Sequence, residues 1–510
     1  MRSNARWVAS LLAWVAVLGG LELWARAVLR QAPPDAVQRI MEAERLAEPK
    51  RPGEVRLFLF GGSTMNGAHF NAYSSPQIWL RLLLHDLCDD PSAWRVINFA
   101  RDGRGTDEIV ARMRRILPYE PDAFFIYAAH NEGLAVNSRK LEPIDAVKDF
   151  FRRSQFIQLA EAWLERRRDQ LRALRKQVRS QVGAGRVGMV KQPTSLDLVP
   201  PGSEKKRRIE ENCRRNLRTM YELARTHNTA CLLSTFVSNE VDFPPARSQH
   251  TEGLEAAARQ EWESLTRAAQ ERLAAKRWAQ AIPLLAKARA LDPVYAQTAF
   301  DLGTCYRQTG RYDEAQEQFA DAIELDALPN RDSPRLNEYV QDVARDYGMP
   351  VVEFRKRFQQ LASHGLIGHN LIVDNCHLDV RGHYLLARTF LETLAKLQPF
   401  ASRTLHWERL KSFEAYERGL NATDAERAET YRHIGTYVGS HFDWAIDAYQ
   451  QALAYQPHDA GTEQLLILAY YQARRQAELR EAMAQMEREH PADFAQMLTA
   501  YPELAGVSSR

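Results

Sequence analysis

The sequence has few cysteines and little net charge. Its 510 residues include only five cysteines, an odd number, and these are widely scattered. Such spacing matches neither a disulfide framework nor a cysteine-based metal site, so we expect buried free thiols. Lys and Arg number 68 against 65 Asp and Glu, a formal net charge of +3. This balance gives no bulk preference for nucleic acid, and we expect no nucleic-acid partner.

A long hydrophobic run occurs at the N-terminus. The stretch WVASLLAWVAVLGGLELWA contains about 19 residues, the length of a membrane-spanning helix. Ala25-Arg26-Ala27 is a poor signal-peptidase site, which favours a retained anchor at 1–31 over a cleaved signal peptide. A polar, proline-containing stalk is expected at 32–54. The rest of the chain would then lie outside the cytoplasmic membrane.

Short hydrophobic runs alternate with amphipathic patterns after the stalk. Strands are expected at 55–60, 94–100, 123–129, 229–240 and 349–354, and helices at 76–88, 106–117, 214–227, 333–348 and towards the end of 371–394. This alternation predicts an α/β fold with a parallel sheet covered by helices on both faces. Polar clusters that follow the strands should then meet at the carboxyl edge of the sheet.

An all-α region interrupts this domain. Apolar residues recur 34 positions apart in three pairs, Ala281 with Ala315, Leu285 with Phe319, and Ala288 with Ala322. That period is typical of tetratricopeptide repeats, which commonly bind proteins, although ordinary helical hairpins are an alternative. We expect a repeat insertion at 255–328 and similar helices at 405–500. The α/β domain would comprise 55–250 and 332–400.

A second insertion is expected at 140–212. Between Arg152 and Lys191 it carries eleven Lys and Arg residues against three acidic ones, with apolar residues at helical spacing. This pattern predicts a basic amphipathic helix. It is either a solvated charged helix or a lid that contacts anionic lipid headgroups or an anionic glycan.

The first strand runs into the glycine-rich stretch GGSTMNG. A phosphate-binding loop would need a lysine and a hydroxyl after its last glycine, but Gly67 is followed by Ala68 and His69. A purely structural turn is an alternative. The third alternative makes Ser63 a nucleophile, which would require a base, an orienting carboxylate and donors for an oxyanion.

Residues of those types follow other expected strands. Asp374 and His377 are three positions apart, so the carboxylate can orient the imidazole. The backbone amide of Gly103 is unobstructed by a side chain, and Asn131 supplies a neutral amide donor.

Further polar residues near these positions are candidates for substrate contact. They are His130 beside Asn131, and Thr235 and Asn239 at the end of an expected strand. An alternative makes His369, Asp374, His377 and His383 metal ligands. We predict no metal and no cofactor.

Four blocks in order, GGSTMNG, NFARDGRGT, AHNE and DNCH, resemble those of the SGNH (GDSL) hydrolases, in a form combined with tetratricopeptide repeats. The resemblance covers 55–250 and 332–395. It implies a flavodoxin-like three-layer α/β/α fold and an esterase mechanism that uses Ser63, His377 and Asp374. The oxyanion hole would comprise Ser63, Gly103 and Asn131. The chain departs from the family at four positions, namely Gly62 in place of the aspartate of GDS, Ala100, Ala129 and Glu132.

These features together predict a membrane-anchored serine esterase. The anchor would be a single N-terminal pass with the catalytic domain extracytoplasmic, and the substrate an acylated envelope glycan or lipid. One alternative is an O-acyltransferase that uses the same triad on an envelope polysaccharide. Another is a catalytically degenerate scaffold whose repeats recruit a protein partner.

Overall fold

The computed structural model describes residues 40–42, 44, 46, 49–133, 198–328, 331, 334–369, 371–439 and 441–508. The predicted anchor at 1–31, part of the stalk and the basic stretch from Arg152 to Lys191 lie outside these ranges. Across the described ranges, no helix is both long and apolar enough to cross a membrane. The α/β residues and both helical blocks belong to one compact unit, Lys50–Ser138 with Pro193–Arg510.

Four parallel strands form the sheet, in the order β2-β1-β3-β4. They are β1 (Val55–Gly61), β2 (Trp94–Asn98), β3 (Ala123–Tyr127) and β4 (Ala230–Leu233). Every residue of β1 and β3 is buried, as expected for central strands covered on both faces. Four strand predictions were too long, since β2 ends at Asn98 and β3 at Tyr127 rather than at 100 and 129. The run at 229–240 leaves the sheet after Leu233, and that at 349–354 contributes one parallel bridge, between Val352 and Ser234.

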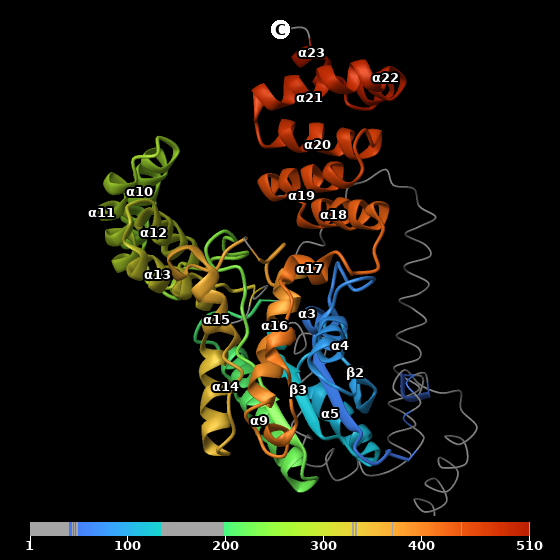
Figure 1. The fold of residues 1–510 in the computed structure, drawn as a ribbon. Coiled ribbons are helices and arrows are strands. Elements are labelled where there is room, and N and C mark those ends of the chain that lie inside the picture. Colours follow the sequence, from blue (N-terminus) through green and yellow to red (C-terminus); the bar gives the residue numbers. More distant parts are fainter. Residues whose placement is uncertain are drawn as a thin grey trace, which may run out of the picture. The chain divides into compact units, whose positions relative to one another are not determined.

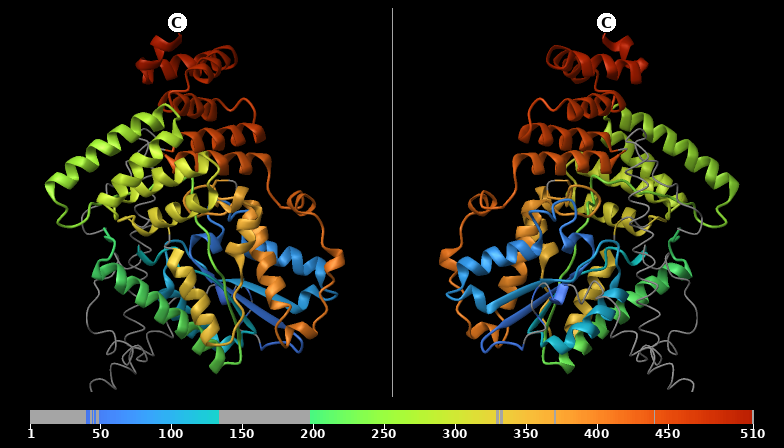
Figure 2. Two further views of the ribbon diagram at one scale, coloured as in Figure 1. Left: turned by 90° about the vertical axis from the view of Figure 1, so that its left-hand side faces the viewer. Right: turned by 90° about the vertical axis from the view of Figure 1, so that its right-hand side faces the viewer.

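Two groups of helices cover the sheet, and Figure 2 shows the sheet between them. Helix α4 (Pro76–Leu87) contacts α16 (Val380–Leu394). On the other side, α9 (Glu204–Thr226) contacts both α5 (Thr106–Ile116) and α14 (Pro334–Asp346). Helix α9 begins at a Ser203 cap, whose side chain accepts from the Lys206 backbone N–H. The predicted insertion at 140–212 therefore ends too late, because 204–212 belong to α9.

The inserted helical block comprises α10 (Ala256–Ala274), α11 (Trp278–Leu291), α12 (Ala296–Gln308) and α13 (Tyr312–Glu324). Each helix contacts the next along the chain (Figure 1). A Cβ on Gly303 would lie 3.0 Å from the Phe319 ring. A small residue on one helix thus faces a large one on its partner, as the 34-residue period predicts.

The C-terminal block has the same construction. It comprises α18 (Asp424–Val438), α19 (Phe442–Tyr455), α20 (Ala460–Gln472), α21 (Gln476–Glu489) and α22 (Pro491–Ala500), followed by α23 (Ala505–Ser508). Shorter α-helices lie elsewhere in the unit, namely α3 (Ser63–Asn66), α15 (Phe354–Leu361) and α17 (Phe413–Glu417). Consecutive helices from α18 to α22 contact each other, so the block is a continuous stack.

Candidate active site

Ser63 begins the short helix α3 directly after β1. Gly61 has no room for a side chain, because a Cβ there would collide with the Tyr127 carbonyl and the Met65 side chain. Gly67 ends the helix with a φ of 79°, in the left-handed region that glycine adopts readily. These glycines make the turn tight enough to hold Ser63, which is partly exposed, at the carboxyl end of β1.

Asp374 and His377 lie in one tight loop. An antiparallel bridge between Ile372 and Leu378 closes the loop, and the Val373 N–H donates to the His377 carbonyl at 2.9 Å. The Asp374 Oδ1 atom accepts from the backbone N–H groups of Cys376 (2.9 Å) and His377 (2.8 Å). The carboxylate thus stabilises its own loop, which fixes the imidazole beside it.

The loop brings His377 between Ser63 and Asp374, and these three residues are called the triad below. His377 Nε2 lies 2.7 Å from Ser63 Oγ, and His377 Nδ1 lies 2.5 Å from Asp374 Oδ2. Because an ionised carboxylate only accepts, the proton between them belongs to Nδ1. Nε2 is then free to accept the Ser63 hydroxyl proton.

The electrostatics of the triad follow from burial and pairing. Burial alone would raise the pKa of Asp374, but His377 and His69 hold the pKa well below its ordinary value. Burial alone would lower the pKa of His377, but the Asp374 carboxylate raises the pKa above its ordinary value. The pair is therefore arranged to stabilise a protonated imidazole, the state that follows removal of a proton from Ser63.

A second histidine, His69, was not predicted as part of the site. Its Nε2 lies 3.0 Å from Asp374 Oδ2, the same oxygen that His377 contacts. The ring centroids of His69 and His377 are 5.0 Å apart, and the rings are nearly perpendicular. The residue has a φ of 70°, in the left-handed region that is uncommon for residues other than glycine. The spacing of His69 from Ser63 in the sequence does not predict its contact with Asp374.

The four residues considered as alternative metal ligands, His369, Asp374, His377 and His383, do not come together around one point. His369 stacks on Trp444 with centroids 4.9 Å apart, and buried His383 contacts Ser74 Oγ at 3.2 Å. The ligating atoms of His69, Asp374 and His377 do lie within 4.8 Å of one another. However, two ligands on one tetrahedral zinc ion would be about 3.3 Å apart. The 2.5 Å contact between His377 and Asp374 is too short for that and fits a direct hydrogen bond.

The two other predicted oxyanion donors lie on loops at the same edge. Asn131 is buried, and its Nδ2 donates to the Arg104 carbonyl at 3.1 Å beside the Gly62 backbone. Gly103 is exposed and has a φ of 68°. Its loop is fixed to the Ser63 turn by a hydrogen bond from the Arg101 N–H to the Gly61 carbonyl at 3.2 Å.

The three predicted substrate contacts are all buried. His130 contacts the Val237 carbonyl at 3.1 Å, and burial lowers its pKa to about 4. The Thr235 hydroxyl accepts from the Arg355 N–H at 3.0 Å. Asn239 Nδ2 donates to the Asp374 carbonyl at 3.2 Å, and its N–H donates to the Asn375 carbonyl at 2.9 Å. Asn239 therefore stabilises the Asp374 loop through two hydrogen bonds. Its position after an expected strand does not predict this role.

Glu132 departs from the family pattern and has a structural role. It accepts from the Thr106 N–H at 2.7 Å and from the Thr106 hydroxyl at 2.9 Å. Gly105 occupies the cap position of α5 and has no side chain to cap the helix, so Glu132 accepts from the first N–H of the helix instead. Burial raises the pKa of Glu132 to about 7.

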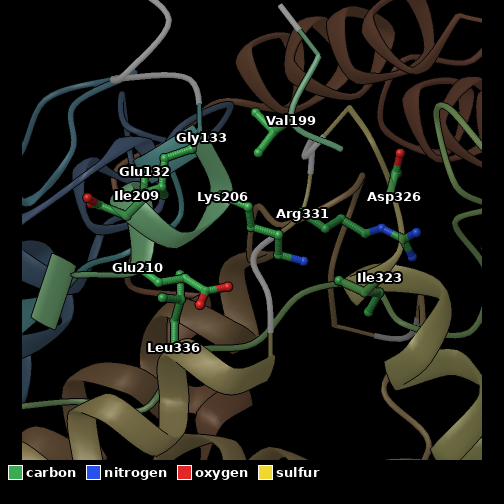
Figure 3. A pocket seen from close by; sticks show the side chains of 10 residues that line it. All are labelled: Glu132, Gly133, Val199, Lys206, Ile209, Glu210, Ile323, Asp326, Arg331 and Leu336. Atoms are coloured by element: carbon green, nitrogen blue, oxygen red, sulfur yellow. The ribbon is translucent and has the colours of Figure 1, made fainter. Parts of the chain in front are cut away.

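A separate pocket lies beside Glu132 (Figure 3). None of the triad lines it. Two of its charged residues are already paired, because Lys206 Nζ lies 2.6 Å from Glu324 Oε1 and Asp326 accepts from the Ala246 N–H at 2.7 Å. Its lining residues are Glu132, Gly133, Val199, Lys206, Ile209, Glu210, Ile323, Asp326, Arg331 and Leu336.

Comparison with known proteins identifies one part of the chain. A tetratricopeptide repeat family model matches 272–331. No curated protein matches the chain. Among solved structures, a protein from Parabacteroides merdae described as a GDSL-like lipase is 10% identical, with a TM-score of 0.30, over 67% of this chain and 95% of that one. The Cut9–Hcn1 hetero-tetramer of the APC/C is 14% identical, with a TM-score of 0.15, over 48% and 43%.

Proposed function

We propose that the protein is a serine hydrolase of the SGNH type that cleaves acyl esters. The observation that carries the proposal is the hydrogen-bonded chain from Ser63 Oγ through His377 to Asp374, with contacts of 2.7 and 2.5 Å. A serine activated in this way is the nucleophile of covalent acyl transfer.

His377 takes the Ser63 proton as the oxygen attacks the ester carbonyl. Asp374 holds the tautomer and stabilises the imidazolium that forms. The developing oxyanion is stabilised by the backbone amides of Ser63 and Gly103 and by the Asn131 side chain. The alcohol leaves with the proton from His377, and water then releases the acyl group from Ser63. A sugar hydroxyl in place of that water would make the protein an acyltransferase.

The proposed setting is the outer side of the cytoplasmic membrane. The apolar stretch within 1–31 supports an N-terminal anchor, and the substrate is then an acylated envelope glycan or lipid. The family match at 272–331 supports a protein partner, since these repeats commonly bind proteins. Membrane fractionation of the full chain tests the anchor, because a soluble, uncleaved protein would contradict it.

Turnover of p-nitrophenyl acetate tests the reaction. Ser63→Ala should abolish turnover, whereas Ser363→Ala, which changes an exposed serine in a short 3-10 helix, should leave it unchanged. Equal turnover in the wild type and in Ser63→Ala would contradict the proposal.

A further inference from the structure

One helix of the C-terminal block packs against the loop that follows Ser63. The ring of Tyr437, on α18, lies 4.9 Å from the His69 ring, and that of His433 lies 5.8 Å from it. One residue further on, Phe70 packs against Tyr431 at 5.9 Å. Helix α18 therefore forms a wall beside the triad, although it is more than 350 residues from Ser63 in the sequence.

The next helix, α19, packs the C-terminal block against a second loop, the one that precedes Asp374. Trp444, on α19, stacks on His369 with the ring planes 7° apart, and His369 precedes Asp374 by five positions. Phe243 packs against both His441 (4.6 Å) and Trp444 (5.7 Å). The block thus contacts the loops on both sides of the triad. The position of Tyr437 is set by this packed interface.

Tyr437 remains open to solvent despite these contacts. It is 54% exposed, and among the described residues only Leu361 is a comparably exposed large hydrophobic side chain. Its ring centroid lies 6.4 Å from that of His377. An aromatic face beside the base of the triad, with a hydroxyl that can donate and accept, is available to a bound molecule.

A carboxylate, Asp102, lies close enough to act electrostatically on both Tyr437 and His377. Asp102 is exposed, and its Oδ1 accepts from Asn66 Nδ2, on the helix that begins with Ser63, at 3.0 Å. Burial lowers the pKa of His377 and Asp374 raises it. Asp102 also raises this pKa, by less than Asp374 does. The surroundings of His377 therefore include an exposed aromatic ring and an exposed hydrogen-bond acceptor.

We propose that Tyr437 is a substrate-contact residue supplied by the C-terminal block, and that the site takes a short acyl ester on a hydroxyl-rich sugar ring. This inference rests on the proposed function and chooses between its two substrate classes. The C–H face of a sugar ring packs on Tyr437, while its hydroxyls donate to Asp102. A long acyl chain would require an extended apolar channel, whereas Tyr437 is a single ring with a polar tip.

The test compares two esters on the full chain, a mono-O-acetylated disaccharide and p-nitrophenyl palmitate. The wild type should hydrolyse the acetylated disaccharide with the higher kcat/KM. Tyr437→Ala should raise KM for the disaccharide about 10-fold, with a smaller effect on kcat, because one aromatic contact is lost. Tyr437→Phe keeps the ring and should recover most of this loss. Tyr471→Ala, on α20 of the same block, is the matched control and should leave KM unchanged.

Labelling of Ser63 by a fluorophosphonate distinguishes a failure of the proposed function from a failure of this inference alone. No labelling of the wild type would overturn the proposed function and this inference with it. A labelled wild type that prefers the palmitate, or does not hydrolyse the disaccharide, would overturn the substrate class. An unchanged KM in a Tyr437→Ala protein that still labels would overturn the role of Tyr437.

Discussion

Asn131 occupies the space that a side chain at residue 62 would need. A Cβ built on Gly62 would lie 2.5 Å from Asn131 Nδ2. The family that the sequence resembles has an aspartate at this position. The absence of that aspartate would by itself suggest reduced catalytic activity. Here the missing side chain instead makes room for the amide that we propose as an oxyanion donor.

Restoring the family residue should therefore reduce activity. Gly62→Asp should displace the Asn131 amide and lower kcat by on the order of 10²–10³, the usual loss for one oxyanion donor. The fold should survive, because the collision is with the end of a side chain. Adding Gly62→Asp to Asn131→Ala should cost little more, since both changes remove the same donor. Wild-type turnover in Gly62→Asp would show that Asn131 has no such role.

The sequence predicts the site through a topological rule and a family resemblance. Parallel strands place the segments that follow them at one edge of the sheet, so Ser63, Gly103 and Asn131 are expected together, and the family resemblance adds Asp374 and His377 to them. The same rule cannot distinguish a side chain that faces solvent from one that supports a neighbouring loop. Thr235 and Asn239 are therefore predicted as substrate contacts, although both are buried.

Two residues near the triad could not be found from the sequence. His69 contacts Asp374, which is 305 positions away in the sequence, from a left-handed backbone conformation that the sequence does not reveal. Tyr437 reaches the site through the packing of α18 and α19, which involves side chains from several distant segments. Repeat periodicity identifies helices that pair with each other, but it does not indicate which surface the stack covers.

The pH dependence of turnover should report His377. Asp374 stabilises the protonated imidazole, so the pKa of His377 is raised above its ordinary value of 6.5. Only neutral His377 accepts the Ser63 proton, and kcat/KM should fall as pH falls through this raised pKa. Asp374→Asn should move the inflection to lower pH and reduce the rate strongly. A wild-type inflection below 6.5 would contradict the assigned pairing.

Glu132 should make stability depend on pH. Its pKa is about 7 in the folded chain because of burial, against an ordinary value of 4.5. The folded state therefore favours the protonated carboxyl, and stability should be lost as pH rises from about 4.5 through 7. Glu132→Gln, which mimics the protonated form, should be more stable than the wild type at pH 8, by at most ~3 kcal/mol.

Urea unfolding at several pH values measures this difference. The gain should vanish near pH 4, where Glu132 is protonated in both states. The control for the loss of one glutamate charge is Glu503→Gln, which changes an exposed side chain. A constant difference between Glu132→Gln and the wild type across this range would contradict the raised pKa.

Gly435 is a packing position of the C-terminal block. A Cβ there would collide with the ring of buried Tyr449 on α19. Gly435→Ala should therefore destabilise the α18–α19 pair by ~1–3 kcal/mol, the usual cost of overpacking. Gly461→Ala is the matched control in α20, because its Cβ would have no neighbour closer than 3.7 Å. If urea unfolding gives the two variants the same free energy of unfolding, the packing of Gly435 against Tyr449 would be contradicted.

The reactivity of Ser63 tests the central proposal most directly. The full-length protein is treated with a fluorophosphonate, which modifies an activated serine, and the labelled residue is identified by peptide mass spectrometry. We expect a single label on Ser63 that is lost in Ser63→Ala and strongly reduced in His377→Ala. A wild-type protein that folds but takes no label on Ser63, or labels equally in His377→Ala, would show that the serine is not activated by the triad.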